Sequence, residues 1–397
     1  MRDNKIFKLA DRYIGIILLI ILYPVNQILK LRKRVVPGNI LVIKLSAMGD
    51  TILLIPALKF LREQFPDSQI DFLCTTINNK IIENCPYINN IILLDINRLI
   101  INPVKTLQFI INLFNKKYDT VIDADQWLRI SALLSFFTFA RQRAGFYTRN
   151  QYKHYLFTDI IEHDREKHEV ECFLDLVVPV IDDSLETIKT RTLKGATTSF
   201  PIDKGGKIKL EYWVSENDLI QAKQILEKTG INRKFIIIHP SVPGHGWQRQ
   251  FPIEKVIQLC NELLKLSDNY QIVLTGTKND EQLVNGILKS VNNTNLYRIT
   301  GIPLNVLAGI LKLSSLLVCN NTGILHLASA LHVPVVAIHG PTDPKKWGPY
   351  DTKSVVIKPK LNCSPCLYLG FEYGCDTNKC IAQIEVNEIL SAIKSLL

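Results

Sequence analysis

The residues best suited to hold an anionic ligand lie between 318 and 331, where a hydrophobic run ends in a short polar loop. Ser315 to Cys319 predicts a buried strand and Ile324 to Leu331 a helix, the junction at which open α/β sheets bind ligands. Thr322 and His326 are four residues apart, so both side chains lie on one face of that helix. Free backbone amides at the helix start favour an anion. A Thr-capped helix with a buried core histidine would give the same pattern.

Two further polar loops follow predicted strands. Residues 240–252 are rich in glycine and proline, and Arg249 adds a positive fork that suits a phosphate. The alternative is a surface arginine beside a Pro-initiated helix. The stretch from Ser46 to Asp50 ends the first strand, and Asp50 there suits a helix N-cap. All three loops are expected to face a crevice between two domains. The chain lacks a convincing dinucleotide fingerprint or P-loop, which disfavours dehydrogenases and nucleoside triphosphatases.

Strands and helices alternate in two sets, which predicts parallel sheets with helices on both faces. The first set has expected strands at 39–45, 70–74, 91–94, 120–123 and 143–146, and helices at 52–64, 103–116 and 128–140. Residues 147–207 lose the rhythm except for a helix at 166–179, and 182–206 are expected to connect two domains. The second set has strands at 235–239, 271–275, 315–319 and 333–339, with helices at 253–266, 279–291, 304–313, 324–331 and 386–397.

The chain of 397 residues is 47% hydrophobic and 21% charged, the composition of a well-packed globular protein of two or three domains. Residues 1–36 carry eight Lys or Arg and two Asp, a large share of the net charge of +10. Between the basic clusters, Ile14 to Val25 forms an apolar run of 12 residues, too short to span a bilayer. We expect residues 1–36 to associate with a membrane surface, with residues 13–29 as the inserting part. An N-terminal helix packed on the protein is the alternative.

The nine cysteines fall into two groups. Five are scattered in apolar segments and predict buried thiols in a reducing compartment. The other four are clustered as C-x2-C-x8-C-x4-C and could hold a structural zinc, form two disulfides or remain free: Cys363, Cys366, Cys375 and Cys380.

Several motifs occur in one order along residues 39–397: Ile40 to Asp50, Trp247 to Pro252, Asn321-Thr322-Gly323 with His326, and Gly340 to Pro344 with Trp347-Gly348-Pro349. Together they closely resemble the ADP-heptose:lipopolysaccharide heptosyltransferase family, glycosyltransferase family 9. The resemblance implies an α/β GT-B fold of two doubly wound Rossmann-like domains that face a central cleft. Residues 37–205 would bind the acceptor, and residues 206–397 would bind a nucleotide sugar. Transfer would need no metal and would invert the anomeric carbon.

The resemblance also implies roles for single residues. Asp50 occupies the position of the family's proposed general base, and Ser46, Met48 and Gly49 would contact the acceptor. The implied donor contacts are Arg249, Thr322, Gly323 and His326 at the diphosphate and sugar, and Asp280 or Glu281 at the ribose. Asn321 stands where family members commonly have Asp, which makes it the residue expected to set the donor sugar. The arginines that could meet an anionic acceptor, or could be solvated helix charges, are Arg62, Arg129, Arg141 and Arg143.

The function expected from this resemblance is transfer of a heptose, or a related sugar, from ADP-heptose to a lipopolysaccharide core or related glycolipid. The enzyme would be cytoplasmic, peripheral or monotopic on the cytoplasmic face of the inner membrane. It would bind no nucleic acid and require no cofactor beyond a possible structural zinc. Two other readings are an enzyme of the same GT-B shape, such as a nucleotide-sugar epimerase, and a non-catalytic GT-B binding protein.

Overall fold

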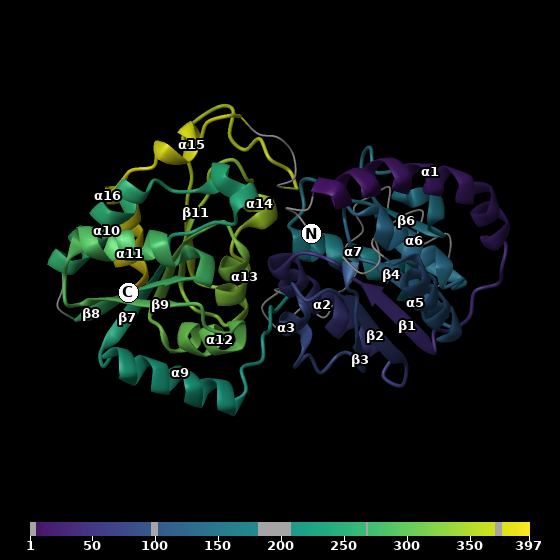
Figure 1. The fold of residues 1–397 in the computed structure, drawn as a ribbon, viewed down its shortest axis with the longest axis horizontal. Helices are drawn as coiled ribbons and strands as arrows, with labels where there is room; N and C mark the ends of the chain where they lie inside the picture. Colours follow the sequence, from purple (N-terminus) through teal and green to yellow (C-terminus); the bar gives the residue numbers. More distant parts are fainter. Residues whose placement is uncertain (1–4, 97–101, 182–207, 267–268, 370–374) are drawn as a thin grey trace. The chain divides into compact units, whose positions relative to one another are not determined.

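The computed structural model describes residues 5–96, 102–181, 208–266, 269–369 and 375–397. The chain divides into two compact units, Met1–Ile208 and Lys209–Leu397. Each unit contains a six-stranded parallel sheet with helices packed on it, as the alternating pattern predicted (Figure 1). The expected connecting segment, 182–206, lies outside the described residues. Each unit is described by itself, and the expected central cleft stays a prediction.

The sheet of unit 1 has the strand order β3-β2-β1-β4-β5-β6. Its strands are β1 (Asn39–Ile43), β2 (Gln69–Cys74), β3 (Asn90–Leu93), β4 (Thr120–Asp123), β5 (Gln142–Tyr147) and β6 (Asp159–Glu162). The chain builds the sheet in one direction from β1 and in the other from β4, so the topological switch point lies between these two neighbours. Their apolar side chains are buried because both faces of a parallel sheet are covered.

The helices of unit 1 pack in two groups. The segments are α1 (Lys5–Leu29), α2 (Met48–Gln64), α3 (Asn79–Ile82), α5 (Pro103–Asn115), α6 (Arg129–Phe137), α7 (Glu169–Ile181) and the 3₁₀ helix η1 (Lys153–Leu156). Helix α2 packs against α7, whereas α1 packs against α6 and η1. The start of α7 therefore lies close to the start of α2, which carries Asp50.

The sheet of unit 2 has the order β12-β11-β10-β7-β8-β9, with its switch point between β10 and β7. Its strands are β7 (Lys234–His239), β8 (Tyr270–Gly276), β9 (Leu296–Thr300), β10 (Leu316–Asn320), β11 (Val335–Ile338) and β12 (Ser354–Ile357). Strands β6, β9 and β12 were not predicted. Each lies at the edge of its sheet, where a strand is covered less completely and lacks a continuous apolar run.

The helices of unit 2 are α9 (Glu216–Thr229), α10 (Ile253–Leu266), α11 (Glu281–Val291), α12 (Leu304–Leu313), α13 (Gly323–Ala330), α14 (Pro344–Trp347), α15 (Lys379–Ala382) and α16 (Val386–Leu396). Helices α10, α11 and α16 enclose an apolar core against the sheet, whereas α9 packs against α12. Two 3₁₀ helices, η2 (Gly244–Arg249) and η3 (Lys278–Asp280), follow β7 and β8. Helix α9 was not predicted, because its largely polar sequence lacks a clear apolar stripe.

The N-terminal helix is longer than the predicted 12-residue apolar run. Helix α1 has 25 residues, and its segment Phe7–Leu29 is long and apolar enough to cross a bilayer by length and composition. Polar groups near both ends nevertheless bind it to unit 1. The Asp11 carboxylate accepts hydrogen bonds from the backbone amides of Arg129 and Ile130, and the Asn26 amide donates to the carbonyl of Tyr155. Helix α1 therefore lies along the surface of unit 1 (Figure 1).

Candidate active site

Asp50 lies at the carboxyl edge of the first sheet, beside its topological switch point. It is the third residue of α2, and its side chain is 16% exposed. The ammonium of Lys44, the residue after β1, lies 3.3 Å from the Asp50 carboxylate and is fully buried. The N-cap of α2 is Ala47, so the expected capping role of Asp50 is wrong. The carboxylate is held by a buried cation instead.

The loop before Asp50 is fixed by hydrogen bonds from neighbouring segments. The Asn78 amide donates to the Lys44 carbonyl, and the Asp125 carboxylate accepts from the Leu45 amide. Of the three residues predicted to contact the acceptor, Ser46 and Gly49 are buried and Met48 is 37% exposed. Met48 is thus the side chain of the three that is most open to a ligand.

A row of buried polar groups continues inward from Lys44. Its ammonium donates to Gln126 Oε1 at 2.5 Å, and Gln126 Nε2 donates to Glu169 Oε1 at 2.5 Å. Glu169, at the start of α7, has both carboxylate oxygens 2.9 Å from His163 Nε2. None of these four residues was predicted from the sequence as part of a site. Lys44, Gln126 and Glu169 are far apart in the chain, so no spacing signal marks them.

A second buried ion pair stabilises the neighbouring loop. Lys153 Nζ lies 3.2 Å from Asp123 Oδ2, and neither side chain is exposed. Burial raises the pKa of Asp123 to about 6, and the Lys153 ammonium opposes that rise. Lys153 also donates to the Asp125 carbonyl, and the Asp125 carboxylate accepts from the backbone amides of Trp127 and Leu128 before α6. This pair holds the loop that carries Gln126.

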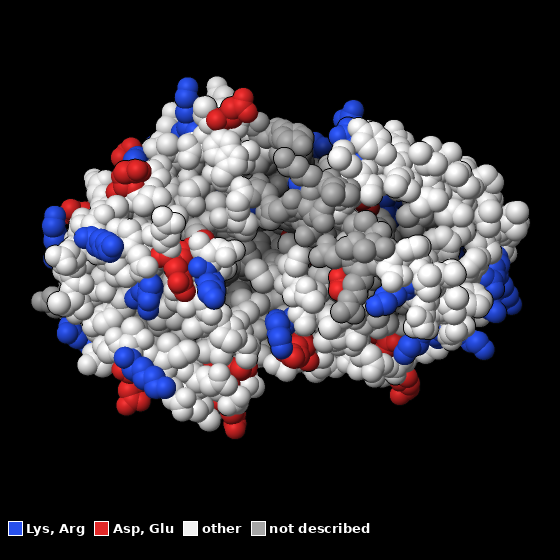
Figure 2. Space-filling model, viewed as in Figure 1, with Lys and Arg blue, Asp and Glu red and all other residues white. Residues whose placement is uncertain are grey.

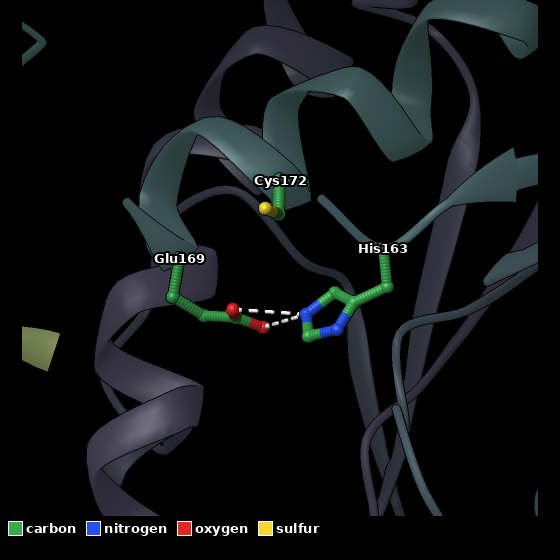
Figure 3. Close-up of side chains that lie close together, drawn as sticks. All are labelled: His163, Glu169 and Cys172. Carbon is green, nitrogen blue, oxygen red and sulfur yellow. Dashed lines mark hydrogen bonds and ion pairs between the residues drawn. The ribbon is translucent and has the colours of Figure 1, made fainter. Parts of the chain in front are cut away.

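Among the described residues, one group of at least three potential metal ligands has its donor atoms within 4.8 Å of one another, and it is not the predicted zinc site. It consists of His163, Glu169 and Cys172, all buried (Figure 3). Both Glu169 oxygens contact the same histidine nitrogen, and the Cys172 thiol donates to the carbonyl of Asp164 at 3.4 Å. These contacts are those of a hydrogen-bonded histidine and carboxylate beside a buried thiol.

The four clustered cysteines lie in the C-terminal part of unit 2, and the zinc site expected there stays a prediction. Cys363, Cys366 and Cys375 are exposed, whereas Cys380 is buried. Burial raises the pKa of the Cys380 thiol, and the nearby Cys366 and Cys375 raise it further. No disulfide joins any two of these four cysteines.

Three of the four arginines considered for an anionic acceptor bind backbone carbonyls of unit 1. Arg62 donates to several carbonyls in the turn after α2, and Arg129 donates to one in the segment before η1. Arg143 is fully buried, donates to the carbonyl of Leu156, and has its pKa lowered to about 10 by burial. Arg141 is exposed.

In unit 2, the two predicted ligand loops meet at the carboxyl edge between β7 and β10. Arg249 Nη1 donates to the backbone carbonyl of Asn321 at 2.9 Å. The Asn320 side chain accepts from the Phe251 amide and donates to the carbonyl of Pro240. A Cβ atom at Gly246 would lie 2.2 Å from the Arg249 guanidinium, so glycine lets this group pack against the loop. The guanidinium is therefore fixed beside the start of α13.

Helix α13 begins where the sequence predicted an anion site. Thr322 is its N-cap residue, Gly323 is its first residue, and the Thr322 hydroxyl contacts the carbonyl of Asn320 at 3.4 Å. His326 lies one turn further on and is buried. The amides of the first turn have no acceptor within the helix, which gives this end a partial positive charge. Arg249 adds a full positive charge close to it.

The side chain of Asn321 is turned into the protein. Its amide nitrogen donates to the carbonyl of Trp347 at 3.1 Å and lies 3.1 Å from Nδ1 of His339. Burial lowers the pKa of His339 to about 4, so this ring is neutral near pH 7 and can accept a hydrogen bond. Both acceptors require a donor, which an ionised aspartate would not supply.

The two candidate ribose residues follow β8 on the other side of β7. The Asp280 carboxylate accepts from both the backbone amide and the hydroxyl of Thr277, so it forms a capping box. Glu281 is the first residue of α11. Burial lowers the pKa of the neighbouring His239 to about 4, and the negative charge of Asp280 opposes that shift. Both acidic residues thus lie at the same sheet edge as Arg249.

Two doubly wound units with polar sites at their switch points define a GT-B-type glycosyltransferase architecture. The family model of glycosyltransferase family 9 (heptosyltransferase) matches residues 106–375. The chain therefore belongs to this family and is a glycosyltransferase, as the motif order predicted.

Relatives from two bacteria are similar to this chain over most of its length. Lipopolysaccharide heptosyltransferase 1 of Campylobacter coli is 24% identical over 365 residues, which cover 90% of this chain and 98% of the relative. The structure of ADP-heptose lipopolysaccharide heptosyltransferase II of Escherichia coli aligns with a TM-score of 0.69 and 22% identity, covering 90% and 98% of the two chains. An E. coli heptosyltransferase with ADP aligns with a TM-score of 0.62 and 20% identity, covering 90% and 100%.

The neutral state of His339 predicts a pH dependence of stability. Its folded-state pKa of about 4 lies below the ordinary value of 6.5, so the unfolded chain binds the proton first as the pH falls. The free energy of unfolding should therefore fall between pH 6.5 and 4, with His339 contributing about 1.4 kcal/mol per pH unit. Chemical denaturation of His339→Gln should show a shallower loss than wild type in this window and a constant difference above pH 7. Equal slopes would refute the prediction.

Proposed function

We propose that this protein is an inverting glycosyltransferase that transfers a heptose from ADP-heptose to a lipopolysaccharide core or related glycolipid. The names of its relatives support the donor and acceptor, and one solved relative holds ADP. The observation that carries the proposal is the Asp50 carboxylate, partly exposed and held by Lys44 at the switch point of unit 1. Unit 1 would bind the acceptor and unit 2 the nucleotide sugar.

In the proposed reaction, an acceptor hydroxyl oxygen attacks the anomeric carbon of the donor and its proton passes to Asp50. The bond between that carbon and the ADP oxygen breaks, and ADP leaves with the electron pair. The ammonium at 3.3 Å and the helix start both stabilise the negative charge of Asp50. Asp50 therefore takes the proton late, after bond formation has made the hydroxyl more acidic.

The leaving ADP would be stabilised at the loops of unit 2. Arg249 and the first amides of α13, at Thr322 and Gly323, would oppose the charge that develops on the diphosphate. His326 would contact the phosphates or the sugar, and Asp280 or Glu281 the ribose. We propose that these groups supply the positive charge that the leaving diphosphate needs, and that the reaction proceeds without a metal ion. Because the Asn321 side chain binds internal acceptors, its effect on the donor would act through the shape of this loop.

We further propose that α1 docks unit 1 on the cytoplasmic face of the inner membrane, where a glycolipid acceptor resides. Its outward face carries exposed apolar side chains, among them Ile14, Ile17 and Ile21. The apolar face of α5 continues this surface through Phe139, whose ring contacts Phe114. Figure 2 shows that this face of unit 1 is largely uncharged, with Lys and Arg side chains at its margin. Such a surface fits a bilayer with anionic headgroups.

Replacing the base should separate turnover from nucleotide binding. Asp50→Asn keeps the shape of the side chain but removes the proton acceptor, so turnover should fall about 10²- to 10⁴-fold. The affinity for ADP, measured by calorimetry, should stay within about two-fold, because Asp50 contacts the acceptor oxygen and not the nucleotide. Asp67→Asn, an exposed carboxylate beyond the other end of α2, is the matched control and should retain activity. A folded Asp50→Asn enzyme with wild-type turnover would remove Asp50 from the mechanism.

Charges on the outward face of α1 should release the protein from membranes. We expect the double variant Ile17→Glu/Ile21→Glu to bind anionic phospholipid vesicles at least about ten-fold more weakly in co-sedimentation, because two apolar side chains are lost from the interface. Ile220→Glu, at an exposed position of α9 in unit 2, should bind as wild type. Unchanged binding of the α1 variant would exclude this docking surface.

A further inference from the structure

A continuous row of polar side chains connects the partly exposed Asp50 to the interior of unit 1. Asp50 faces Lys44 at 3.3 Å, Lys44 donates to Gln126, and Gln126 donates to Glu169. His163 is the last member of the row, and its Nε2 atom contacts both carboxylate oxygens of Glu169 (Figure 3). All members except Asp50 are buried. This row of five residues is called the inner relay below.

Lys44 is placed between two carboxylates. It contacts Asp50 directly and reaches Glu169 through the amide of Gln126. The orientation of that amide is fixed, because the reverse orientation would turn its hydrogens toward the ammonium and its oxygen toward the carboxylate. In a buried setting such aligned hydrogen bonds polarise one another. Glu169 is therefore electrically coupled to Lys44 even though the two side chains do not touch.

The coupling between Glu169 and Lys44 has its effect when Asp50 takes a proton. Asp50 then loses its negative charge, and Lys44 would be left as a buried cation without a counter-charge if no second carboxylate were near. Glu169 supplies that counter-charge through Gln126. Lys44 thus has a carboxylate within reach whether or not Asp50 has taken the proton, and an ion buried without a partner would be strongly unfavourable.

We propose that Lys44 and Glu169 are positioning residues that set the proton affinity of Asp50 in opposite directions, which rests on the proposed role of Asp50 as the base. The Lys44 ammonium favours the ionised carboxylate, whereas Glu169 draws part of the Lys44 charge away from it. Neither residue needs to touch the substrate. Their balance determines the lowest pH at which Asp50 can accept the proton.

Several other charged groups near α2 have partners of their own. Helix α7 presents Glu169 through Gln126, and its Asp175 is bound by Lys167. On α3, Lys80 and Glu83 bind each other at the surface. At the end of β4 the buried Asp123 faces Lys153, and the Asp125 carboxylate is held by backbone amides. The inner relay is therefore the route by which buried charge in this part of unit 1 reaches Asp50.

The test is the pH dependence of kcat/KM for two isosteric variants. Lys44→Met removes the ammonium, so the pH at which kcat/KM falls to half its plateau on the acid side should rise by about one unit or more. Glu169→Gln removes the counter-charge that reaches Lys44 through Gln126, so the ammonium acts more strongly on Asp50. The same pH midpoint should therefore fall, by a smaller amount. A structural role alone would lower activity at every pH without moving the midpoint in opposite directions.

Two further variants keep the test valid if a single charge deletion harms folding. The double variant Lys44→Met/Glu169→Gln removes both charges and should fold better than Lys44→Met, with a midpoint between those of the two single variants. Lys167→Met deletes another lysine of unit 1 that faces a carboxylate, Asp175 of α7, but lies outside the inner relay. It should keep the wild-type midpoint.

The outcomes separate this inference from the proposed function. Suppose that Asp50→Asn is inactive and that the pH midpoints of Lys44→Met and Glu169→Gln shift in the same direction or not at all. The proposed role of the inner relay is then refuted, while Asp50 remains the base. If Asp50→Asn keeps full turnover, the base assignment itself fails. Opposite shifts of the two midpoints, with an unmoved Lys167→Met control, support the inference.

Discussion

The buried ammonium of Lys44 is the constraint on which the candidate catalytic edge of unit 1 depends. A cation without solvent exposure is tolerated only where opposite charge and hydrogen-bond acceptors surround it. Its direct partners come from the start of α2 and the loop after β4, and Gln126 of that loop in turn binds Glu169 at the start of α7, which makes three separate segments. Satisfying one buried charge therefore fixes the relative positions of all three, including the Asp50 carboxylate.

At the switch point on the equivalent edge of its sheet, unit 2 carries positive charge instead of the carboxylate found in unit 1. Its loops are joined by the hydrogen bond from Arg249 to the Asn321 carbonyl and by the Asn320 side chain. Positive charge is thereby gathered at the start of α13, in a loop held by the neutral His339. In the proposed function, the edge of unit 1 activates an acceptor oxygen and the edge of unit 2 stabilises a leaving nucleotide.

The central architecture could be predicted from the sequence because parallel strands covered on both faces are uniformly apolar. Strands β1, β4 and β7 carry that signal, whereas the edge strands β6, β9 and β12 do not. The length of α1 was underestimated because Asp11 and Asn26 interrupt its apolar pattern, and the structure shows both bound to unit 1. These two polar residues thus mark where the apolar helix packs on unit 1. The sequence alone could not show that packing.

The candidate site was predicted only in part. Asp50, Arg249 and the 320–323 loop were found because they follow strands in sequence. The inner relay was not found, because Gln126, His163 and Glu169 come together only through the pairing of β1 with β4 and the packing of α2 on α7. The structural zinc at the four clustered cysteines stays a prediction, although Cys366 and Cys375 lie close enough to Cys380 to raise its pKa.

The most direct measurement of the central claim is the melting temperature of the protein with a panel of nucleotide sugars. A ligand at about 100 times its dissociation constant stabilises the folded state by about 2.7 kcal/mol, which should raise the melting temperature by several degrees. We expect ADP-heptose to produce this rise, with no comparable rise from UDP-linked sugars, and Arg249→Ala to abolish it. A response only to a UDP-sugar, or to no member of the panel, would contradict the proposed donor and favour a different GT-B activity or a binding protein.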